Sequence, residues 1–491
     1  MNPEEVLDDK KFLGHPRGVG ALAAGNFFNS FAWGALYAIL IFYLYTPYTK
    51  GLGFTEGQAA SMITAMAACN SIFGILGSWL ADRVLGMRKA LIIGNIVKGT
   101  AFGILAIPAF SLTQGRIFAL IALFLMALPI MGASNASLTG QLYRKSDNGR
   151  RDAAFTIHGI ANNIAGLVAP VLVGQIGMQN YHIGFLIASI AAFLYGAVIF
   201  VTQHKYFGTL GEKPVKPLEE GKFAKLFIRF MSIMVVFIGT IVVLVLNKVM
   251  SFQGVLNIIT SATFIIPIVF LTNLMSKKDL TATDRRRMKP FLKLFSAQIV
   301  MALCGTMLTS TVAIFIDQKI NRNIFGFELA PGSVGTIYTV LGLALAPVFV
   351  WLWTKTRATN IRTTYKYGWG ILFSALGYGL LTIPIIMFKD SAPYNLLWMV
   401  FYYLFLTFSD NLVWPIGSSL VAKLSPDAYD TQMQTAWGQA GTIGNGIALI
   451  LFNFYQTADE QVNLFPIMTA LLLITAVFIF MFSKNIEKDM V

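Results

Sequence analysis

The stretch Ile183-Gly-Phe-Leu-Ile-Ala-Ser-Ile-Ala-Ala-Phe-Leu-Tyr-Gly-Ala-Val-Ile-Phe-Val201 contains no charged side chain. As an α-helix it is long enough to cross roughly 30 Å of membrane hydrocarbon. Similar runs recur along the chain, among them Ile117–Ala133 and Leu464–Phe482. Of the 491 residues, 56% are hydrophobic and 12% are charged, whereas a soluble domain has about 25% charged residues. The sequence therefore predicts an all-α polytopic membrane protein.

The distribution of basic residues indicates a membrane topology and argues against a nucleic-acid partner. The net charge is +14, with 37 Lys and Arg residues, and most of these fall in short segments that we assign to the cytoplasm. This asymmetry follows the positive-inside rule. It predicts a multi-pass protein in the lipid bilayer of the plasma membrane, with both termini in the cytoplasm. Acidic residues precede the first apolar run, so we expect no cleavable signal peptide.

Apolar runs and loop signals together predict 14 transmembrane helices in a six-plus-two-plus-six arrangement. The first six are expected at residues 19–46, 58–82, 89–110, 116–143, 153–176 and 181–203. Two inserted helices are expected at 226–246 and 253–276, before the basic segment Lys277–Lys293. The last six are expected at 291–318, 332–355, 364–388, 393–423, 432–456 and 463–484. The predicted domains are an N-terminal bundle (1–203), a linker carrying the inserted helices (204–290) and a C-terminal bundle (291–491).

The inner end of the second predicted helix reads Gly77-Ser-Trp-Leu-Ala-Asp-Arg-Val-Leu-Gly-Met-Arg-Lys89. This run resembles the loop signature of the major facilitator superfamily, whose fold is two six-helix bundles. The resemblance implies alternating access around a substrate site near the membrane midplane. It also makes the charged residues of the run candidates for closing an inner gate through charge-assisted hydrogen bonds: Asp82, Arg83, Arg88 and Lys89.

Further motifs narrow the resemblance to the proton-dependent oligopeptide transporter family of that superfamily. They are His15-Pro-Arg-Gly18, Gly140-Gln-Leu-Tyr143, Arg150-Arg-Asp152, Phe155-Thr-Ile157, Asn163, Ala165-Gly-Leu-Val-Ala-Pro170, Pro415-Ile-Gly-Ser-Ser-Leu-Val-Ala-Lys-Leu-Ser-Pro426, Trp437 and Gly444-Asn445. Two helices inserted between the halves are also typical of that family's bacterial members. The resemblance implies a transporter of small peptides or related solutes. No acid–base pair, nucleophile constellation, metal cluster or phosphate loop occurs at a plausible spacing, and both cysteines fall in apolar runs, so we expect no enzyme activity, no cofactor and no metal site.

The chain departs from the family pattern where the family carries its charged residues. Helix 1 of the family has a glutamate, a second glutamate three residues later and an adjacent arginine, and the corresponding positions here are Asn26, Asn29 and Ser30. Asp410 stands in place of the helix 10 glutamate. The resemblance then predicts the following substrate-binding residues: Asp410, Trp437, Asn163, Asn26, Asn29, Ser30, Trp33, Tyr37, Ser134 and Tyr338.

These replacements change the expected chemistry. Asn and Ser form hydrogen bonds but do not titrate at physiological pH, so helix 1 cannot serve as the proton switch of the family. With no Arg or Lys expected in the pocket, Asp410 is predicted to bind the substrate's amine. We expect an exchanger or facilitator of small peptides, amino acids or amines, acting as a monomer.

Several alternatives remain open from the sequence. A proton-coupled symporter that uses Asp410 or His158 is one, and a peptide-binding receptor without transport is another. Asp410 is alternatively a structural hydrogen-bonding group, and His158 a packing histidine. Lys98, inside the third helix, is expected to extend back to the membrane surface, with contact to the bundle interior as the alternative.

Overall fold

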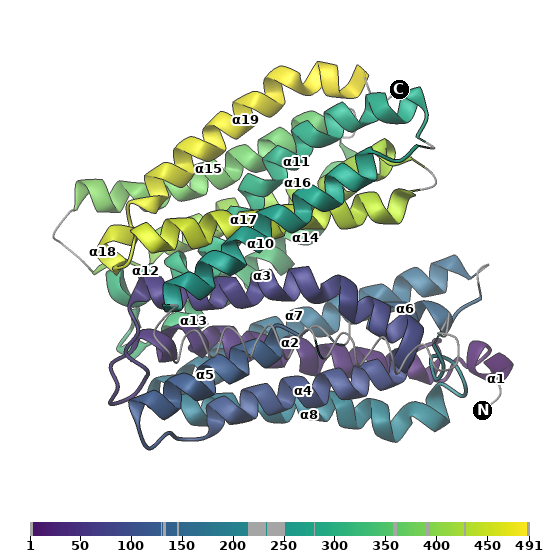
Figure 1. Ribbon diagram of the computed structural model, residues 1–491, viewed down its shortest axis with the longest axis horizontal. Helices are drawn as coiled ribbons and strands as arrows, with labels where there is room; N and C mark the ends of the chain where they lie inside the picture. Colours follow the sequence, from purple (N-terminus) through teal and green to yellow (C-terminus); the bar gives the residue numbers. More distant parts are fainter. Residues whose placement is uncertain are drawn as a thin grey trace. The chain divides into compact units, whose positions relative to one another are not determined.

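The computed structural model describes residues 3–128, 130, 134–144, 147–214, 232, 251–278, 280–356, 361–388, 393–426 and 429–488. These residues are almost entirely helical (Figure 1). They divide into two compact units. Unit 1 contains the described residues of Met1–Tyr43, Tyr48–Leu52 and Cys69–Ile259, and unit 2 contains those of Leu44–Pro47, Gly53–Ala68 and Thr260–Val491.

Unit 1 is built mainly from the N-terminal helices. Its elements are α1 (Pro3–Leu7), α2 (Arg17–Tyr45), the π-helix η1 (Ala81–Leu85), α4 (Met87–Ala106), α5 (Leu112–Met126), α6 (Ser134–Gln141), α7 (Asn148–Gln179) and α8 (Tyr181–Tyr206). α3 (Glu56–Leu80) and α10 (Phe252–Met275) contribute residues to both units. α4 packs along α8 (Figure 1). α2 also meets α8, because Gly25 leaves room for a ring: a Cβ at that position would lie 2.0 Å from Tyr195.

Unit 2 holds the C-terminal helices and four strands of two residues each. The helices are α11 (Ala282–Thr309), α12 (Thr311–Lys319), α13 (Pro331–Val334), α14 (Thr336–Lys355), α15 (Thr363–Met387), α16 (Leu397–Leu424), α17 (Asp430–Phe454), α18 (Ala458–Gln461) and α19 (Leu464–Lys488). β1 (Ile320–Asn321) pairs in parallel with β4 (Tyr394–Asn395), and β2 (Asn323–Ile324) pairs antiparallel with β3 (Phe327–Glu328). α15 packs against both α16 and α19 (Figure 1).

Local sequence explains where several helices begin. Asn180 caps α8 by accepting hydrogen bonds from the backbone N–H groups of His182 and Ile183 at 2.9 and 3.4 Å. α11 begins with a capping box in which Thr281 accepts from Asp284 N and the Asp284 carboxylate accepts from Thr281 N. Such caps satisfy donors that the first helical turn leaves without partners.

The predicted membrane fold is confirmed. In the described part of the chain, nine helices are long and apolar enough to cross a membrane. α3, α16 and α17 are of comparable length, with 25, 28 and 25 residues. The predicted inserted helix at 253–276 corresponds to α10, whereas the one at 226–246 lies outside the described residues.

Three predicted helices differ from the structure, and two of them are divided at a single residue: 291–318 at Ser310, between α11 and α12, and 332–355 at Gly335, between α13 and α14. The continuous helix expected at 116–143 is interrupted, because α5 ends at Met126 and α6 starts at Ser134. α11 starts at Ala282, well before the predicted residue 291. The hydropathy pattern missed this start because the first turns of α11 carry Arg285, Arg286 and Arg287, which suggest a loop.

An ion pair and a hydrogen bond hold the residues that precede α2 in place within unit 1. Arg17 Nε donates to Asp9 Oδ2 at 2.8 Å. Burial of Asp9 opposes its ionisation, but the hydrogen bonds from Arg17 prevail and hold its pKa below the usual value. His15 Nδ1 lies 2.7 Å from Tyr143 OH. Burial, with a smaller contribution from the charge of Arg150, lowers the pKa of His15, while Asp147 opposes the shift.

Candidate functional site

Asp410 lies on α16 of unit 2, and both of its carboxylate oxygens accept hydrogen bonds. Tyr338 OH, from α14, donates to Oδ2. Trp414 Nε1, one turn further along α16, donates to Oδ1 at 3.1 Å. In the described part of the chain no Lys or Arg forms an ion pair with Asp410. The structure thus brings Asp410 and Tyr338 together, as a carboxylate held by two neutral donors.

Trp437, on α17, occupies a different place in unit 2. It is buried, and its ring lies 6.4 Å from that of Tyr367 and 6.3 Å from that of Phe291. A Cβ on Gly417 would meet Trp437 at 2.9 Å. Gly417 lies about two helical turns beyond Asp410, roughly 11 Å along α16. The structure therefore places Trp437 in the packed core of unit 2 and not among the partners of Asp410.

Lys98 forms a second polar cluster, within unit 1. Its ammonium group donates to Asn29 Oδ1 of α2 and to Asn95 Oδ1 of α4, the latter at 3.4 Å. It also lies 5.7 Å from the ring centroid of Trp33. The residue is 6% exposed, so the expectation that Lys98 extends to the membrane surface is wrong. Its two asparagine partners hold the ammonium group between α2 and α4.

Aromatic rings extend this cluster along α2. Trp33 stacks on Tyr37 with ring centroids 5.7 Å apart and an interplanar angle of 23°. The other side of Trp33 meets the edge of Phe102 of α4, also at 5.7 Å. Asn29, Trp33 and Tyr37 are spaced by four residues and therefore lie on one face of α2. Three of the predicted helix 1 residues are thus brought together, beside Lys98, for which the bundle interior was the alternative position.

The remaining predicted residues of unit 1 lie on α2, α6 and α7. Ser30 Oγ donates to Asn162 Oδ1 of α7 at 2.9 Å, whereas the predicted Asn163 is its exposed neighbour. Asn26 is half-buried on α2. Ser134 is buried at the start of α6, and its hydroxyl has no hydrogen-bond partner among the described residues.

His158 lies apart from the Lys98 cluster. It is buried on α7 beside the backbone of Val19, near the start of α2, and it packs edge-on against Phe155 at 6.1 Å, while its Nε2 has no hydrogen-bond partner among the described residues. Val19 and Asn29 are ten residues apart on α2, or roughly 15 Å along the helix. This position fits the packing interpretation of His158 better than a role beside the substrate.

The four predicted gating residues surround the junction of η1 and α4. Asp82 and Lys89 are exposed and Arg83 is half-buried. Arg88 is 1% exposed and is anchored inside unit 1, where it donates to Glu212 Oε2 and to Gln203 O, both at 2.9 Å. Arg88 therefore has a structural anchoring position, and it is the exposed residues of the motif that remain candidates for a gate.

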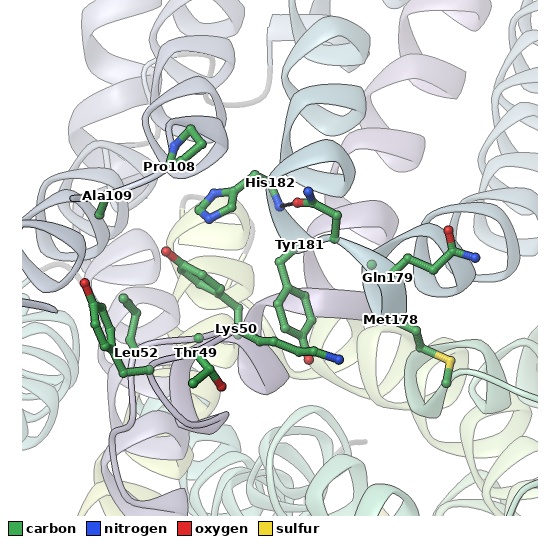
Figure 2. Close-up of a pocket in the computed structure, with 14 residues that line it drawn as sticks. Thr49, Lys50, Leu52, Pro108, Ala109, Met178, Gln179, Tyr181 and His182 are labelled. Atoms are coloured by element: carbon green, nitrogen blue, oxygen red, sulfur yellow. Dashed lines mark hydrogen bonds between the residues drawn. The ribbon is translucent and has the colours of Figure 1, made fainter. Parts of the chain in front are cut away.

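Unit 1 also contains a cavity of about 440 Å³ (Figure 2). It is lined by loop and helix-end residues, including Tyr43, Lys50, Tyr181 and His182. His182 Nδ1 lies 2.9 Å from Leu105 O, which fixes the ring at the cavity wall. None of the predicted site residues lines this cavity.

Among the polar residues of unit 1, Lys98 is the one whose position the sequence predicted wrongly. One signal was available: Asn95 and Lys98 are three residues apart, so two polar side chains share a face of an otherwise apolar helix. A polar pair at that spacing indicates an inward-facing position, because polar groups in membrane helices face partners.

Long apolar helices in two units, with ionisable groups buried on them, are typical of multi-pass transporters. The family model PTR2, described as the POT family, matches residues 89–486. The chain therefore belongs to the POT family, and it is a transporter and not an enzyme.

Individual relatives agree with this family. A di-/tripeptide transporter of Lactococcus lactis subsp. cremoris is 26% identical over 492 residues, covering 98% of each chain. A crystal structure of a peptide transporter POT in complex with sulfate matches with a TM-score of 0.92 and 25% identity, covering 100% of this chain and 99% of the other. A POT family transporter in complex with 5-aminolevulinic acid matches with a TM-score of 0.88 and 25% identity, covering 97% and 98%.

Proposed function

We propose that the protein is a secondary transporter of small peptides, or of peptide-like solutes, in which Asp410 binds the substrate's amine. The family assignment and the similarity to a di-/tripeptide transporter support the substrate class. The observation that carries the proposal is the Asp410 cluster. Its carboxylate is stabilised by Tyr338 and Trp414, which are both neutral, so the cluster keeps a net negative charge.

An ammonium group is the natural complement of this cluster. A charge-assisted hydrogen bond is about twice as strong as a neutral one, and a carboxylate has about four lone-pair sites. The two donors from Tyr338 and Trp414 leave room for further donors. The Trp414 ring, half exposed beside the carboxylate, adds a face that attracts cations.

Lys98 supplies the opposite charge in unit 1. A peptide carries a carboxylate as well as an ammonium group, and the ammonium group of a lysine such as Lys98, which donates to Asn29 and Asn95, is a point-charge partner for a carboxylate. As a separate part of the proposal, Lys98 gives unit 1 a group that can recognise a carboxylate. It takes a role that the resemblance assigns to an arginine at the position of Ser30.

Exchange or facilitated transport is the mode that the residues favour. Asn26, Asn29 and Ser30 cannot titrate. His158 lies on α7, beside the start of α2 and apart from the Lys98 cluster. The proposal therefore assigns no proton switch to helix α2. A proton-coupled symporter remains the second candidate, because Asp410 itself is an ionisable group at membrane depth. In both cases the protein acts as a monomer in the plasma membrane, with both termini cytoplasmic.

Proteoliposome transport with a labelled dipeptide tests the proposal. We expect uptake by counterflow, against internal unlabelled dipeptide, to exceed uptake driven by an inward proton gradient. Accumulation under the gradient alone would favour the symporter. Asp410→Asn should reduce the apparent affinity for the dipeptide roughly 30-fold, because a charge-assisted contact contributes about 2 kcal/mol.

A matched control separates loss of the amine site from loss of folding. Asp459→Asn removes another carboxylate of unit 2, one that is exposed and pairs with Lys319 at 2.5 Å. This variant should transport at the wild-type rate. If Asp410→Asn transports the dipeptide with unchanged affinity, the assignment of Asp410 is wrong.

A further inference from the structure

Unit 2 contains an apolar groove between α14 and α15, two helices that both pack on α16. Phe408 and Leu412 of α16 form its floor. The two walls and the end of the groove are formed by Val348, Phe349 and Leu352 of α14, by Trp369 and Phe373 of α15, and by Ile361. The cavity measures about 410 Å³, which is within the roughly 300–1,000 Å³ range of small-molecule sites.

Aromatic packing makes the floor and walls one continuous surface. The ring of Phe408 lies 5.9 Å from Phe349 on one side and 5.4 Å from Phe373 on the other. Trp369 lies 6.3 Å from Phe373 and is 48% exposed. Val348 is 50% exposed. The groove is therefore open along its length and lined by hydrocarbon, apart from a single charged side chain.

That charged side chain, Lys366, lies on the first turns of α15. Lys423 lies in the last turn of α16, the helix that contributes Phe408 and Leu412 to the groove. Two more basic residues lie at the neighbouring helix ends: Lys355 in the last turn of α14 and Arg362 at the start of α15. The groove thus has a cationic end, which would attract an anion.

We propose that this groove binds an anionic phospholipid, with an acyl chain along Phe408 and its phosphate between Lys366 and Lys423. A negatively charged headgroup matches the cationic end, and basic sites between membrane helices are known binding positions for such headgroups. Phosphatidylcholine is a poorer match, because its choline group would place a positive charge beside Lys366 and Lys423. The proposal does not depend on the transported substrate.

The test is thermal unfolding of the full chain in a neutral detergent, with phosphatidylglycerol or phosphatidylcholine of the same acyl chains added in increasing amounts. Phosphatidylglycerol should raise the unfolding temperature of the wild type at lower concentrations than phosphatidylcholine. Lys366→Gln and Lys423→Gln should each weaken the effect of phosphatidylglycerol about fivefold, from the contribution of one lysine near an anionic lipid. The matched control is Lys278→Gln, an exposed lysine between α10 and α11, which should change nothing.

Two further arms separate the acyl chain from the headgroup. Val348→Trp fills the open wall of the groove and should weaken the effect of phosphatidylglycerol while both lysines remain. Glycerophosphoglycerol, the headgroup without chains, should give no stabilisation. Four results would each overturn the proposal: equal effects of the two lipids, an undiminished preference for phosphatidylglycerol in both Lys366→Gln and Lys423→Gln, an unaffected Val348→Trp variant, or stabilisation by the free headgroup.

Discussion

Replacing Lys98 with glutamine should change the stability and the substrate affinity of the protein in opposite directions. Lys98 is 6% exposed on a membrane-spanning helix, where a lysine costs about 2.5–3.5 kcal/mol on an insertion scale. Its charge-assisted hydrogen bond to Asn29 offsets roughly 2 kcal/mol of this cost, and the bond to Asn95, at 3.4 Å, adds little. Glutamine still forms hydrogen bonds with asparagine but has no charge. Lys98→Gln should therefore raise the free energy of unfolding by roughly 1 kcal/mol.

Affinity should fall in the same variant. If Lys98 holds the substrate carboxylate, the loss of a charge-assisted hydrogen bond of about 1.5–3 kcal/mol weakens dipeptide binding about 10- to 150-fold. A dipeptide with an amidated C-terminus has no carboxylate, so its affinity should be low for the wild type and unchanged in the variant. The assays are thermal unfolding in detergent and binding of both ligands by calorimetry.

The combination of results decides the role of Lys98. A variant that is more stable and binds the free dipeptide weakly shows a residue retained for function at a cost in stability. A variant that is less stable and binds the dipeptide as tightly as the wild type would show that Lys98 only joins α2 to α4. Equal binding of the free and amidated dipeptides by the wild type would refute carboxylate recognition, while the transport assay would still test the proposed function.

Two further predictions concern backbone strain and pH. Gly86 has φ +76° and a Cβ there would lie 2.5 Å from Glu212 O, whereas Gly14 has φ +82° with nothing within 4 Å of its Cβ position. Gly86→Ala should therefore lower the unfolding temperature clearly more than Gly14→Ala. Equal effects would mean that only the backbone strain of a positive φ matters and not the steric contact. The pKa of His15 is lowered in the folded state by burial and by Arg150, so below the unfolded pKa of about 6.5 the unfolded chain binds more protons and stability falls. The loss between pH 7 and pH 5 should be smaller in His15→Gln, measured by thermal unfolding, and a loss of equal size would exclude His15 as its source.

The sequence predicts the membrane helices well because hydrocarbon imposes a simple requirement. A run such as Ile183–Val201 must be helical at membrane depth to satisfy its backbone groups, and α8 spans it. Boundaries in polar sequence are harder to predict. The start of α11 depends on a hydrogen-bond exchange between Thr281 and Asp284, which hydropathy does not register. The predicted domain boundaries at 203 and 291 stay a prediction.

The sequence predicted which residues belong to the candidate site better than it predicted the contacts between them. Asp410 and Tyr338 were both chosen from the sequence, and the hydrogen bond between them follows from the packing of α14 on α16. Trp437 was chosen by resemblance, yet the rings that surround it depend on tertiary packing alone. For Lys98, the length and flexibility of the side chain allow either a surface or an interior position, and the choice is made by Asn29 on another helix.

The early start of α11 limits how this helix moves in the membrane. Because successive residues of a helix are about 100° apart, Arg285, Arg286 and Arg287 point in nearly all directions around the axis and form a collar. Arg285 reaches Lys277 O at 3.2 Å, and Arg286 reaches Lys488 O at 3.5 Å. Sliding the helix inward by one turn, about 5.4 Å, would carry this collar toward hydrocarbon at about 2.5–3.5 kcal/mol for each arginine that reached the centre. Piston-like translation of α11 is therefore opposed, and tilting or rotation about the collar is the motion that remains inexpensive.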